Sequence, residues 1–509
     1  MNKSYFSFKK FEDYTKTEAL VVLLNTLSFI GVIYLIARFV SIAFYLNHYE
    51  LLHIDERIII NDIYNVWNLD NEFNRYPKIE NPVIKNIFLI ITEISYGGDL
   101  RYGRIWSNIF IFLMGPFSLF GDRVLITSVR IFTIIFYFIS INILINLFLN
   151  KKLRWFYLLA FYSLPGVLYF NSVPKPDPFV IFFISLGLLY LKKEKYYLSI
   201  VIFAIATGVK IVGIFGLVLA VLYLFKTKKI SLNQKSISKV ILSVWLGIVV
   251  SNPVLILPPI KIYNLPNFYA IYYKWIDSQS LYDQEARFSI EYFNKWIETL
   301  SIHFSYNLTR SPIFFYFGIF LTIFLVYLLL KKKEFMLTLV TLIGLTHLIF
   351  IIISVQRQWI LYLNYSFIFI LIGAFYYLNK YSQNKYLAQL IFLMILVPNG
   401  FIKINSSIDA KSPYPSEDLN NIPEVIQKIE TLYKTRSENY YLVFWDPSFG
   451  MPRNKVTYDS FFDVRENWEG HELDYILENS DFYVTKNEIK SDNYNSYKVQ
   501  DYFIYSRPD

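Results

Sequence analysis

The apolar stretch that decides the fold lies at residues 124–149 and has the sequence VLITSVRIFTIIFYFISINILINLFL. It is followed directly by Asn150-Lys151-Lys152-Leu153-Arg154. About 20 apolar residues are enough for a helix to cross a bilayer, and basic residues just beyond such a helix favour the cytoplasmic side. The stretch therefore predicts a transmembrane helix whose carboxyl end is cytoplasmic.

Similar apolar runs recur along most of the chain. Lysine-rich segments follow every second run, whereas the alternate short connections are nearly free of lysine and arginine. This alternation predicts an all-α, multi-pass protein of the inner or plasma membrane with about eleven transmembrane helices, a cytoplasmic N-terminus and an extracytoplasmic C-terminus. The expected spans are residues 19–46, 124–149, 155–172, 178–191, two helices within 197–225, then 239–257, 312–330, 336–354, 360–378 and 386–398.

The composition excludes several classes of protein. The 509 residues are 55% hydrophobic, 19% aromatic and only 17% charged, whereas soluble domains carry roughly 25% charged residues. The net charge of +9 lies mainly between the predicted spans, so it favours membrane lipids as partners and gives no support to nucleic acid. There is no cysteine, which excludes thiolate chemistry, and the five histidines lack the spacing of a metal site.

Two local ambiguities are settled by the same alternation. Residues 197–225 could form one tilted helix, but that would place Lys226, Lys228 and Lys229 outside the cell. Two short helices with a break near residues 208–213 are therefore expected. By the same argument, the apolar stretch 105–121 is expected to be an interfacial or re-entrant helix, because a lone crossing there would invert the later spans.

Three long segments are expected on the outer side of the membrane. They are the loops 47–123 and 258–311 of the transmembrane domain 1–398, and the tail that follows a linker at residues 399–420. In residues 421–509 we expect a small α/β domain, because helical and strand-like stretches alternate there. The strands are expected at residues 440–445, 482–485 and 497–505, and the helices at 422–435 and 472–479. No glycine-rich phosphate loop opens these helices.

Acidic residues appear where the first outer loop begins. His53-Ile-Asp55-Glu56-Arg57 follows the first span. Adjacent acids at a helix exit are common as interface charges, but a carboxylate beside a cavity at this depth could also act as a general base. Further along the loop, Asp99 could be a second acid that orients an acceptor, or it could form a plain ion pair with Arg101.

Cations are expected at the same outer level. The turn Pro174-Lys175-Pro176-Asp177-Pro178 joins two spans, and its prolines stop both helices. Charged groups within spans are costly and usually face the protein interior or a wet cavity; here they are Arg38, Arg130, Lys210 and His347. Arg38 could simply be paired for burial, and Arg130 could extend to the interface. The topology predicts that four cations surround a lipid phosphate: Arg57, Lys175, Lys210 and Arg357.

On these residues the chain resembles the membrane-embedded glycosyltransferases of the GT-C superfamily, which includes protein O-mannosyltransferases and the aminoarabinose transferase of lipid A. The matching motifs, in order, are Asp55-Glu56; Tyr102-Gly103 leading to Phe120-Gly121 and Arg130; the proline-rich turn 174–178; Gly208-Val-Lys210; and Ser251-Asn252-Pro253. The resemblance covers residues 19–400. The family's His-Pro-Pro or Lys-Pro-Pro element is reduced to Asn81-Pro82 or replaced by Tyr102-Gly103.

The resemblance implies a transferase that takes a sugar from a polyprenyl-phosphate carrier and passes it to a glycan, lipid or protein acceptor at the outer face. Asp55 would be the general base, with Glu56 beside it and Asp99 as a second acidic site. Arg57, Lys175, Lys210 and Arg357 would bind the donor phosphate, with Arg130 and Asp177 in support. No cofactor is implied with certainty, although a divalent metal could bind if Asp55, Glu56 and Asp99 converge. The alternative is a multi-pass transporter or flippase for a lipid-linked or small-molecule substrate.

Overall fold

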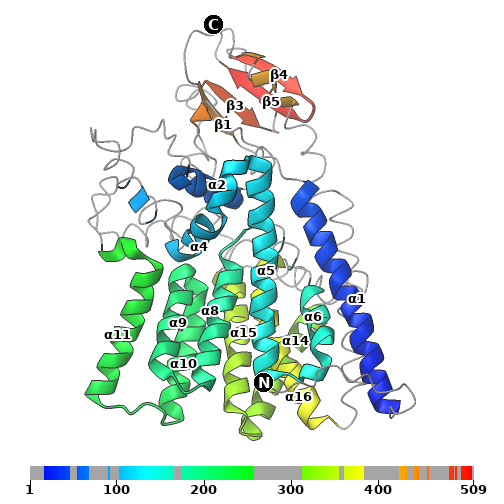
Figure 1. Cartoon of the computed structure of the whole chain (residues 1–509), viewed down its shortest axis with the longest axis vertical. Helices are drawn as coiled ribbons and strands as arrows, with labels where there is room; N and C mark the ends of the chain where they lie inside the picture. Colours follow the sequence, from blue (N-terminus) through cyan, green and yellow to red (C-terminus); the bar gives the residue numbers. More distant parts are fainter. Residues whose placement is uncertain are drawn as a thin grey trace.

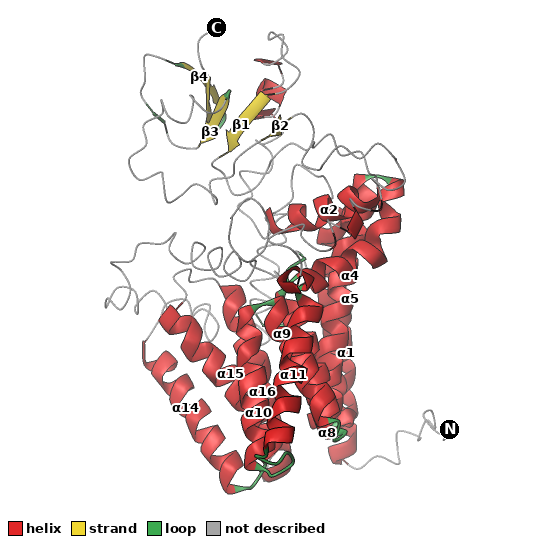
Figure 2. Cartoon of the chain, turned by 90° about the vertical axis from the view of Figure 1, so that its left-hand side faces the viewer, coloured by secondary structure: helices red, strands yellow, loops and turns green. Residues whose placement is uncertain are grey.

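The computed structural model shows a helical bundle with a small β-sheet beyond one of its ends (Figure 1 and Figure 2). It describes residues 16–45, 54–67, 87, 90–91, 94, 103–164, 167, 171, 174–256, 312–354, 360–382, 424–425, 427–429, 431–432, 441–445, 456–457, 481–485, 488–489 and 494–506.

The bundle helices run alternately up and down. The connections at residues 149–153, 193–195, 227–233 and 332–334 all lie at one end of the bundle, here called the lysine-rich end, and α2 and α4 lie across the other, here called the α2 end (Figure 1). The helices are α1 (Lys16–Tyr45), α2 (Ile54–Trp67), α4 (Arg104–Met114), α5 (Asp122–Phe148), α6 (Arg154–Tyr162), α8 (Asp177–Lys192), α9 (Tyr196–Val209), α10 (Ile214–Lys226), α11 (Gln234–Ser251), α14 (Pro312–Lys331), α15 (Phe335–Ser354) and α16 (Ile360–Tyr381), with short 3-10 helices η3 (Gly115–Phe120), η4 (Lys151–Leu153), η5 (Ile211–Gly213) and η6 (Pro253–Ile256).

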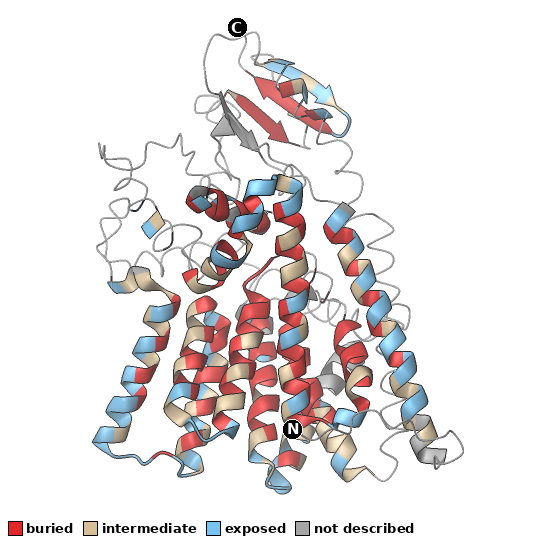
Figure 3. Ribbon diagram, viewed as in Figure 1, coloured by how far each residue is buried: buried red, intermediate tan, exposed pale blue. Residues whose placement is uncertain are grey.

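Three helical segments of the described chain are long and apolar enough to cross a membrane: Val21–Phe44, Asp122–Phe148 and Gln234–Ser251. Several shorter helices are equally apolar. Exposed residues recur along α1 and α11 (Figure 3). Apolar side chains such as Leu23 in α1 and Ile241 in α11 are more than half exposed, which suits contact with lipid. The fold is thus mainly helical and compatible with a membrane protein.

The structure places helix in each predicted span up to residue 378, and the last, at residues 386–398, lies outside the described residues. The expected break in 197–225 is confirmed. Lys210 has an extended backbone (φ −154°, ψ 137°) between α9 and η5. A Cβ at Gly213 would meet Ala206, and one at Gly216 would meet Phe203, so α9 and α10 pack as an antiparallel hairpin whose tip is Lys210.

The apolar stretch 105–121 forms α4 and then η3, which begins at Gly115-Pro116. Aromatic packing holds α4 against the bundle, because the Phe179 ring of α8 lies 5.3 Å from Phe110 of α4 and 4.2 Å from Phe136 of α5, centroid to centroid. The start of α4 is thereby fixed over the ends of α8 and α9.

The sheet has the strand order β2-β1-β3-β5-β4. β1 pairs in parallel with β2 and β3, and β5 pairs antiparallel with both β3 and β4. The expected strands at 440–445 and 482–485 are confirmed, and the described residues within 422–435 are helical. The expected helix at 472–479 lies outside the described residues. The strands are β1 (Tyr441–Trp445), β2 (Val456–Thr457), β3 (Phe482–Thr485), β4 (Asn495–Val499) and β5 (Tyr502–Ser506).

The single strand expected at residues 497–505 is wrong. The chain turns back at Gln500-Asp501, and β4 and β5 form a hairpin. Gln500 has φ +52°, a left-handed conformation typical of two-residue hairpin turns. Because the turn lacks the usual Gly or Asn, the pattern looks like one continuous strand.

Candidate functional site

Helix α2 lies across one end of the bundle and is held by polar contacts at both of its ends. Its apolar side buries Ile59, Ile60 and Ile63 completely. Near its carboxyl end, the Tyr64 hydroxyl donates a hydrogen bond to Asp122 at the start of α5, and Trp67 Nε1 donates to the Ile111 carbonyl of α4 at 2.9 Å. Its position is therefore defined by both α4 and α5.

Glu56 forms a buried ion pair with Arg130 of α5. Arg130 Nε donates to Glu56 Oε1 at 2.7 Å and Nη2 donates to Oε2 at 3.0 Å. The two side chains are only 1–2% exposed. Arg130 therefore does not extend to the interface, and both carboxylate oxygens of Glu56 are engaged. This geometry suits a positioning role better than proton transfer.

A second buried ion pair was not expected from the sequence. Asp62 of α2 accepts a hydrogen bond from Arg104 Nη1 at 2.7 Å, and both side chains are 4% exposed. Arg104 is the first residue of α4. The sequence did contain one indication of this pair, because Asp62 lies within the largely apolar segment 58–63. Its partner Arg104 is 42 residues away, so the pairing itself could not be predicted.

Lys210 is paired with Asp177 where α8 begins. Its Nζ lies 2.9 Å and 3.1 Å from the two carboxylate oxygens, and the Lys210 side chain is 15% exposed. Two of the predicted site residues are thus brought together. Lys175, two residues before Asp177, is also buried.

Three sequence motifs that lie far apart in the chain meet at this hairpin tip. The Gly103 amide donates to the Val209 carbonyl at 3.1 Å, and Asn252 Nδ2 donates to the Gly208 carbonyl at 2.9 Å. The contact requires glycine, because a Cβ at Gly103 would overlap the Gly208 carbonyl oxygen and one at Gly208 would overlap Ser251 Oγ. We call this cluster, made of Gly103, Lys175, Asp177, Gly208–Lys210 and Ser251–Asn252, the Lys210 junction.

The junction lies below α2, part-way down the bundle. Helix α9 rises from the lysine-rich end for about half the length of α5, and a helix gains the same height with every residue. Lys210, which follows α9 directly, therefore lies well below the start of α5. Figure 1 shows α9 ending beneath α2 and α4.

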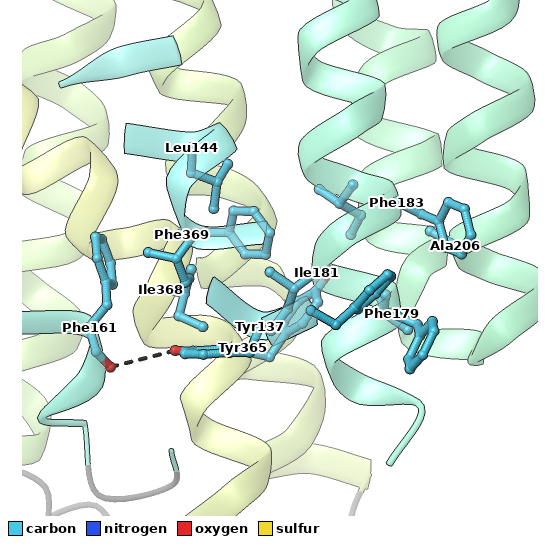
Figure 4. Packing of buried hydrophobic residues seen from close by; sticks show 14 of the residues in the cluster. Tyr137, Leu144, Phe161, Phe179, Ile181, Phe183, Ala206, Tyr365, Ile368 and Phe369 are labelled. Atoms are coloured by element: carbon cyan, nitrogen blue, oxygen red, sulfur yellow. Dashed lines mark hydrogen bonds between the residues drawn. The ribbon is translucent and has the colours of Figure 1, made fainter. Parts of the chain in front are cut away.

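Polar groups continue from the junction into the bundle. His347 of α15 is buried and lies beside Phe215 of α10, and its Nδ1 is 2.7 Å from Ser366 Oγ of α16. On the far side of the core the Tyr137 hydroxyl points at the Phe161 carbonyl, 3.5 Å away (Figure 4). These polar groups are thus packed within the core of the bundle.

The remaining predicted residues are placed only in part. Asp55 and Arg57 belong to α2, but their side chains lie outside the described residues, as do Asp99 and Arg357 altogether. In the described part of the chain, no group of three His, Asp or Glu side chains could hold a metal ion. The divalent metal at Asp55, Glu56 and Asp99 therefore stays a prediction, because of these three side chains the structure describes only Glu56.

Comparison with protein-family models and with curated proteins finds no match to this chain. The resemblance to GT-C glycosyltransferases therefore rests on the sequence motifs alone.

The Lys210 junction and helix α2 together carry the kinds of groups needed to bind an anion and to accept a proton. A cation at a helix break can bind an anionic group, and a partner carboxylate orients the ammonium. A rigid helix above it carries a further acid at position 55, which shares the α2 face of position 62 because seven residues are nearly two full turns.

Proposed function

We propose that the protein is an integral membrane glycosyltransferase that transfers a sugar, with inversion, from a polyprenyl-phosphate donor to an acceptor hydroxyl at the outer face of the membrane. The observation that carries this proposal is the convergence of separate sequence motifs on Lys210 and Asp177, beneath the helix that bears Asp55. A transferase of this kind needs a cation for a phosphate and a base for a hydroxyl close to one recess.

The proposed topology has about eleven crossings, with the lysine-rich end in the cytoplasm. Lysine outnumbers glutamate in the connections at that end, which is the bias expected of cytoplasmic connections. The α2 end, the Lys210 junction and residues 421–509 would then lie on the outer side. A soluble nucleotide sugar in the cytoplasm would be on the wrong side to reach this junction, so a lipid-linked donor is the more consistent class.

The proposed reaction is a single displacement. Asp55 takes the proton of the acceptor hydroxyl, the acceptor oxygen forms a bond to the anomeric carbon, and the bond from that carbon to the phosphate oxygen breaks. The electron pair leaves with the phosphate, whose developing charge is stabilised by Lys210 and Lys175. Arg57 and Arg357 are proposed as further phosphate ligands and Asp99 as the second acidic site.

Glu56 has a different place in this scheme from the one its position beside Asp55 suggests. Because it is paired with Arg130 in the protein interior, we assign it to holding α2 in position. Asp177 likewise acts through Lys210, with which it forms an ion pair. In the proposed complex, the Lys210 ammonium binds both the Asp177 carboxylate and an oxygen of the donor phosphate.

The test is transfer of labelled sugar in membranes supplied with polyprenyl-phosphate sugars. Asp55→Asn is expected to lose about 10²–10⁴-fold in rate, as for removal of a general base. Lys210→Met should lose about 10²–10³-fold through the leaving phosphate. The matched controls are Glu194→Gln and Lys331→Met, which remove the same charges at the lysine-rich end and should leave the rate unchanged. Full activity in Asp55→Asn, in protein that inserts normally, would refute the assignment of the base.

Transport is the second candidate, because broken helices in a bundle are also typical of transporters and the α9–α10 hairpin breaks at Lys210. A transporter would move a lipid-linked sugar across sealed vesicles without forming a new glycosidic bond. Label that changes side while staying on the carrier would favour transport, whereas label found on an acceptor only with intact Asp55 would favour transfer.

A further inference from the structure

A second site lies at the end of the bundle opposite the Lys210 junction. A hollow of about 310 Å³ lies among the ends of α5, α8, α9, α10, α15 and α16. Its volume is near the lower limit for small-molecule pockets, roughly 300–1,000 Å³, so it suits a headgroup rather than a whole lipid. Its apolar lining comes mainly from Leu147, Leu191 and Leu337, and its rim carries Lys192, Lys229 and Glu194.

Each of the two lysines of the rim lies beside an acceptor oxygen. Lys192 Nζ donates to the Leu147 carbonyl at 2.5 Å and lies 5.8 Å from the Phe148 ring centroid. Lys229 Nζ lies 3.3 Å from Glu194 Oε1. Glu194 and Tyr196 raise the pKa of Lys229, so this lysine stays charged at neutral pH. The Glu194 carboxylate offsets one of the two positive charges and leaves the rim net positive.

The side chains around the rim add further positive charge and hydroxyl groups. Lys193 and Lys195 flank Glu194, and Lys228 precedes Lys229. Tyr196 and Tyr223 also line the hollow, and their hydroxyls suit hydrogen bonds to phosphate or glycerol oxygens. Tyr376 lines it as well, but its hydroxyl donates to Glu334. Charge and hydrogen-bonding capacity are therefore both those of an anion site.

An exposed apolar strip leads away from the hollow along α10. Tyr223 lines the hollow, and its neighbour Leu222 is 57% exposed. Val218 and Ile214, each four residues further from the lysine-rich end, are 48% and 37% exposed. Residues four apart share one face of a helix. These exposed side chains therefore follow one face of α10 from the level of the hollow toward the hairpin tip at Lys210, which is the direction an acyl chain would take.

We infer that this hollow binds the headgroup of an anionic phospholipid, with the phosphate between Lys192 and Lys229 and an acyl chain along Ile214, Val218 and Leu222. A soluble anion would use the cationic rim but would gain nothing from the apolar strip. Clusters of lysine at a membrane surface attract anionic lipids. The inference does not depend on the proposed sugar transfer, because it concerns a different site at the opposite end of the bundle.

The test is lipid retention by the full-length protein. The purified chain is placed in nanodiscs of phosphatidylcholine containing phosphatidylglycerol, extracted into mild detergent, and its retained lipid is identified by native mass spectrometry. Wild type is expected to retain phosphatidylglycerol in preference to phosphatidylcholine. The variant Lys192→Gln/Lys229→Gln should lose about 30-fold in this preference, since each lysine near an anionic surface contributes roughly a factor of five.

Two further variants and one competitor keep the test decisive. Lys192→Arg/Lys229→Arg keeps both charges and should retain the lipid, while Lys331→Gln/Lys333→Gln removes two charges from a neighbouring connection and should behave as wild type. Unchanged retention in the double glutamine variant would overturn the site. Displacement of the lipid by millimolar inorganic phosphate would overturn the lipid and leave a free-anion site.

Discussion

Glu56 can serve the site as a base or as a structural partner, and a double-mutant cycle with Arg130 separates these roles. The variants are Glu56→Gln, Arg130→Gln and the two combined. Each single change leaves one charged group buried without its partner, because both side chains are only 1–2% exposed. Breaking a buried pair on one side costs about 3–5 kcal/mol, whereas replacing both partners together is often close to neutral.

The expected result follows from these magnitudes. Each single variant should lower the free energy of unfolding by about 3–5 kcal/mol, and the double variant should lose less than the sum by about 3 kcal/mol or more. Unfolding is measured by titrating SDS into mixed micelles and following helix content. The control cycle uses Lys229 and Glu194, an ion pair whose side chains are 46% and 70% exposed, where no coupling is expected.

Sugar transfer is measured for the same variants, and stability and activity together decide between the two roles of Glu56. A positioning role predicts that stability falls in the single variants and that activity falls along with it. If Glu56→Gln is as stable as wild type but inactive, Glu56 is a catalytic acid or base, and the reasoning from its pairing with Arg130 is refuted.

Two further predictions concern the packing of the Lys210 junction and the acid sensitivity of the lysine-rich end. Gly103→Ala should lower the free energy of unfolding by about 1–3 kcal/mol, because the added Cβ would overlap a backbone oxygen. Gly216→Ala is the milder control in the same SDS titration, because the nearest atom to its Cβ is a side-chain atom at 3.1 Å. Burial alone would raise the pKa of Glu334, but hydrogen bonds from Lys380, Tyr381 and Tyr376 outweigh it and hold that pKa below its ordinary value of 4.5. A carboxyl group whose pKa is lowered by folding contributes stability above its unfolded-state pKa, and this stability is lost as pH falls through its folded-state pKa. Between pH 7 and pH 3 the thermal stability of Glu334→Gln should therefore fall less steeply than that of wild type. Equal slopes in the two proteins would contradict this.

Much of the bundle could be predicted because membrane helices leave two independent signals, the apolar run and the position of lysines. The break at Lys210 is an example. Its flanking segments are each too short to span alone, yet the lysines that follow at 226–229 required an even number of crossings in residues 197–225. Hairpin β4–β5 could not be predicted in this way. Its turn requires a left-handed backbone at Gln500, and glutamine is not a residue type that indicates this conformation.

The partners of the buried charges could not be predicted. A charged residue in an apolar stretch of sequence is expected to be paired, but the stretch does not indicate which residue it pairs with. Glu56 and Arg130 are 74 residues apart, and Asp62 was not singled out at all. By contrast, the proline-rich turn brought attention to Asp177, and the broken hairpin to Lys210, because local chain geometry alone marks both. Their pairing required the packing of α8 against α9.

The two ion pairs of α2 raise the question of what they contribute that apolar contacts would not. Buried pairs are often no more stabilising than well-packed apolar side chains of similar size. Hydrophobic burial is non-directional, so Ile59, Ile60 and Ile63 hold α2 against the bundle without fixing its rotation. The Asp62–Arg104 pair, at 2.7 Å, fixes the helix face that also carries position 55.

We therefore expect Asp62→Leu/Arg104→Met to keep the stability of wild type within about 1–2 kcal/mol while sugar transfer falls about tenfold or more, because a misplaced base loses rate steeply with distance. Single variants of the same pair should lose both stability and activity. The SDS titration and the transfer assay measure the two properties on the same preparations. A double variant that is stable and fully active would show that the pair does not orient α2. The orientation of α2 would then be assigned to its apolar face, the Glu56–Arg130 pair and the hydrogen bonds of Tyr64 and Trp67.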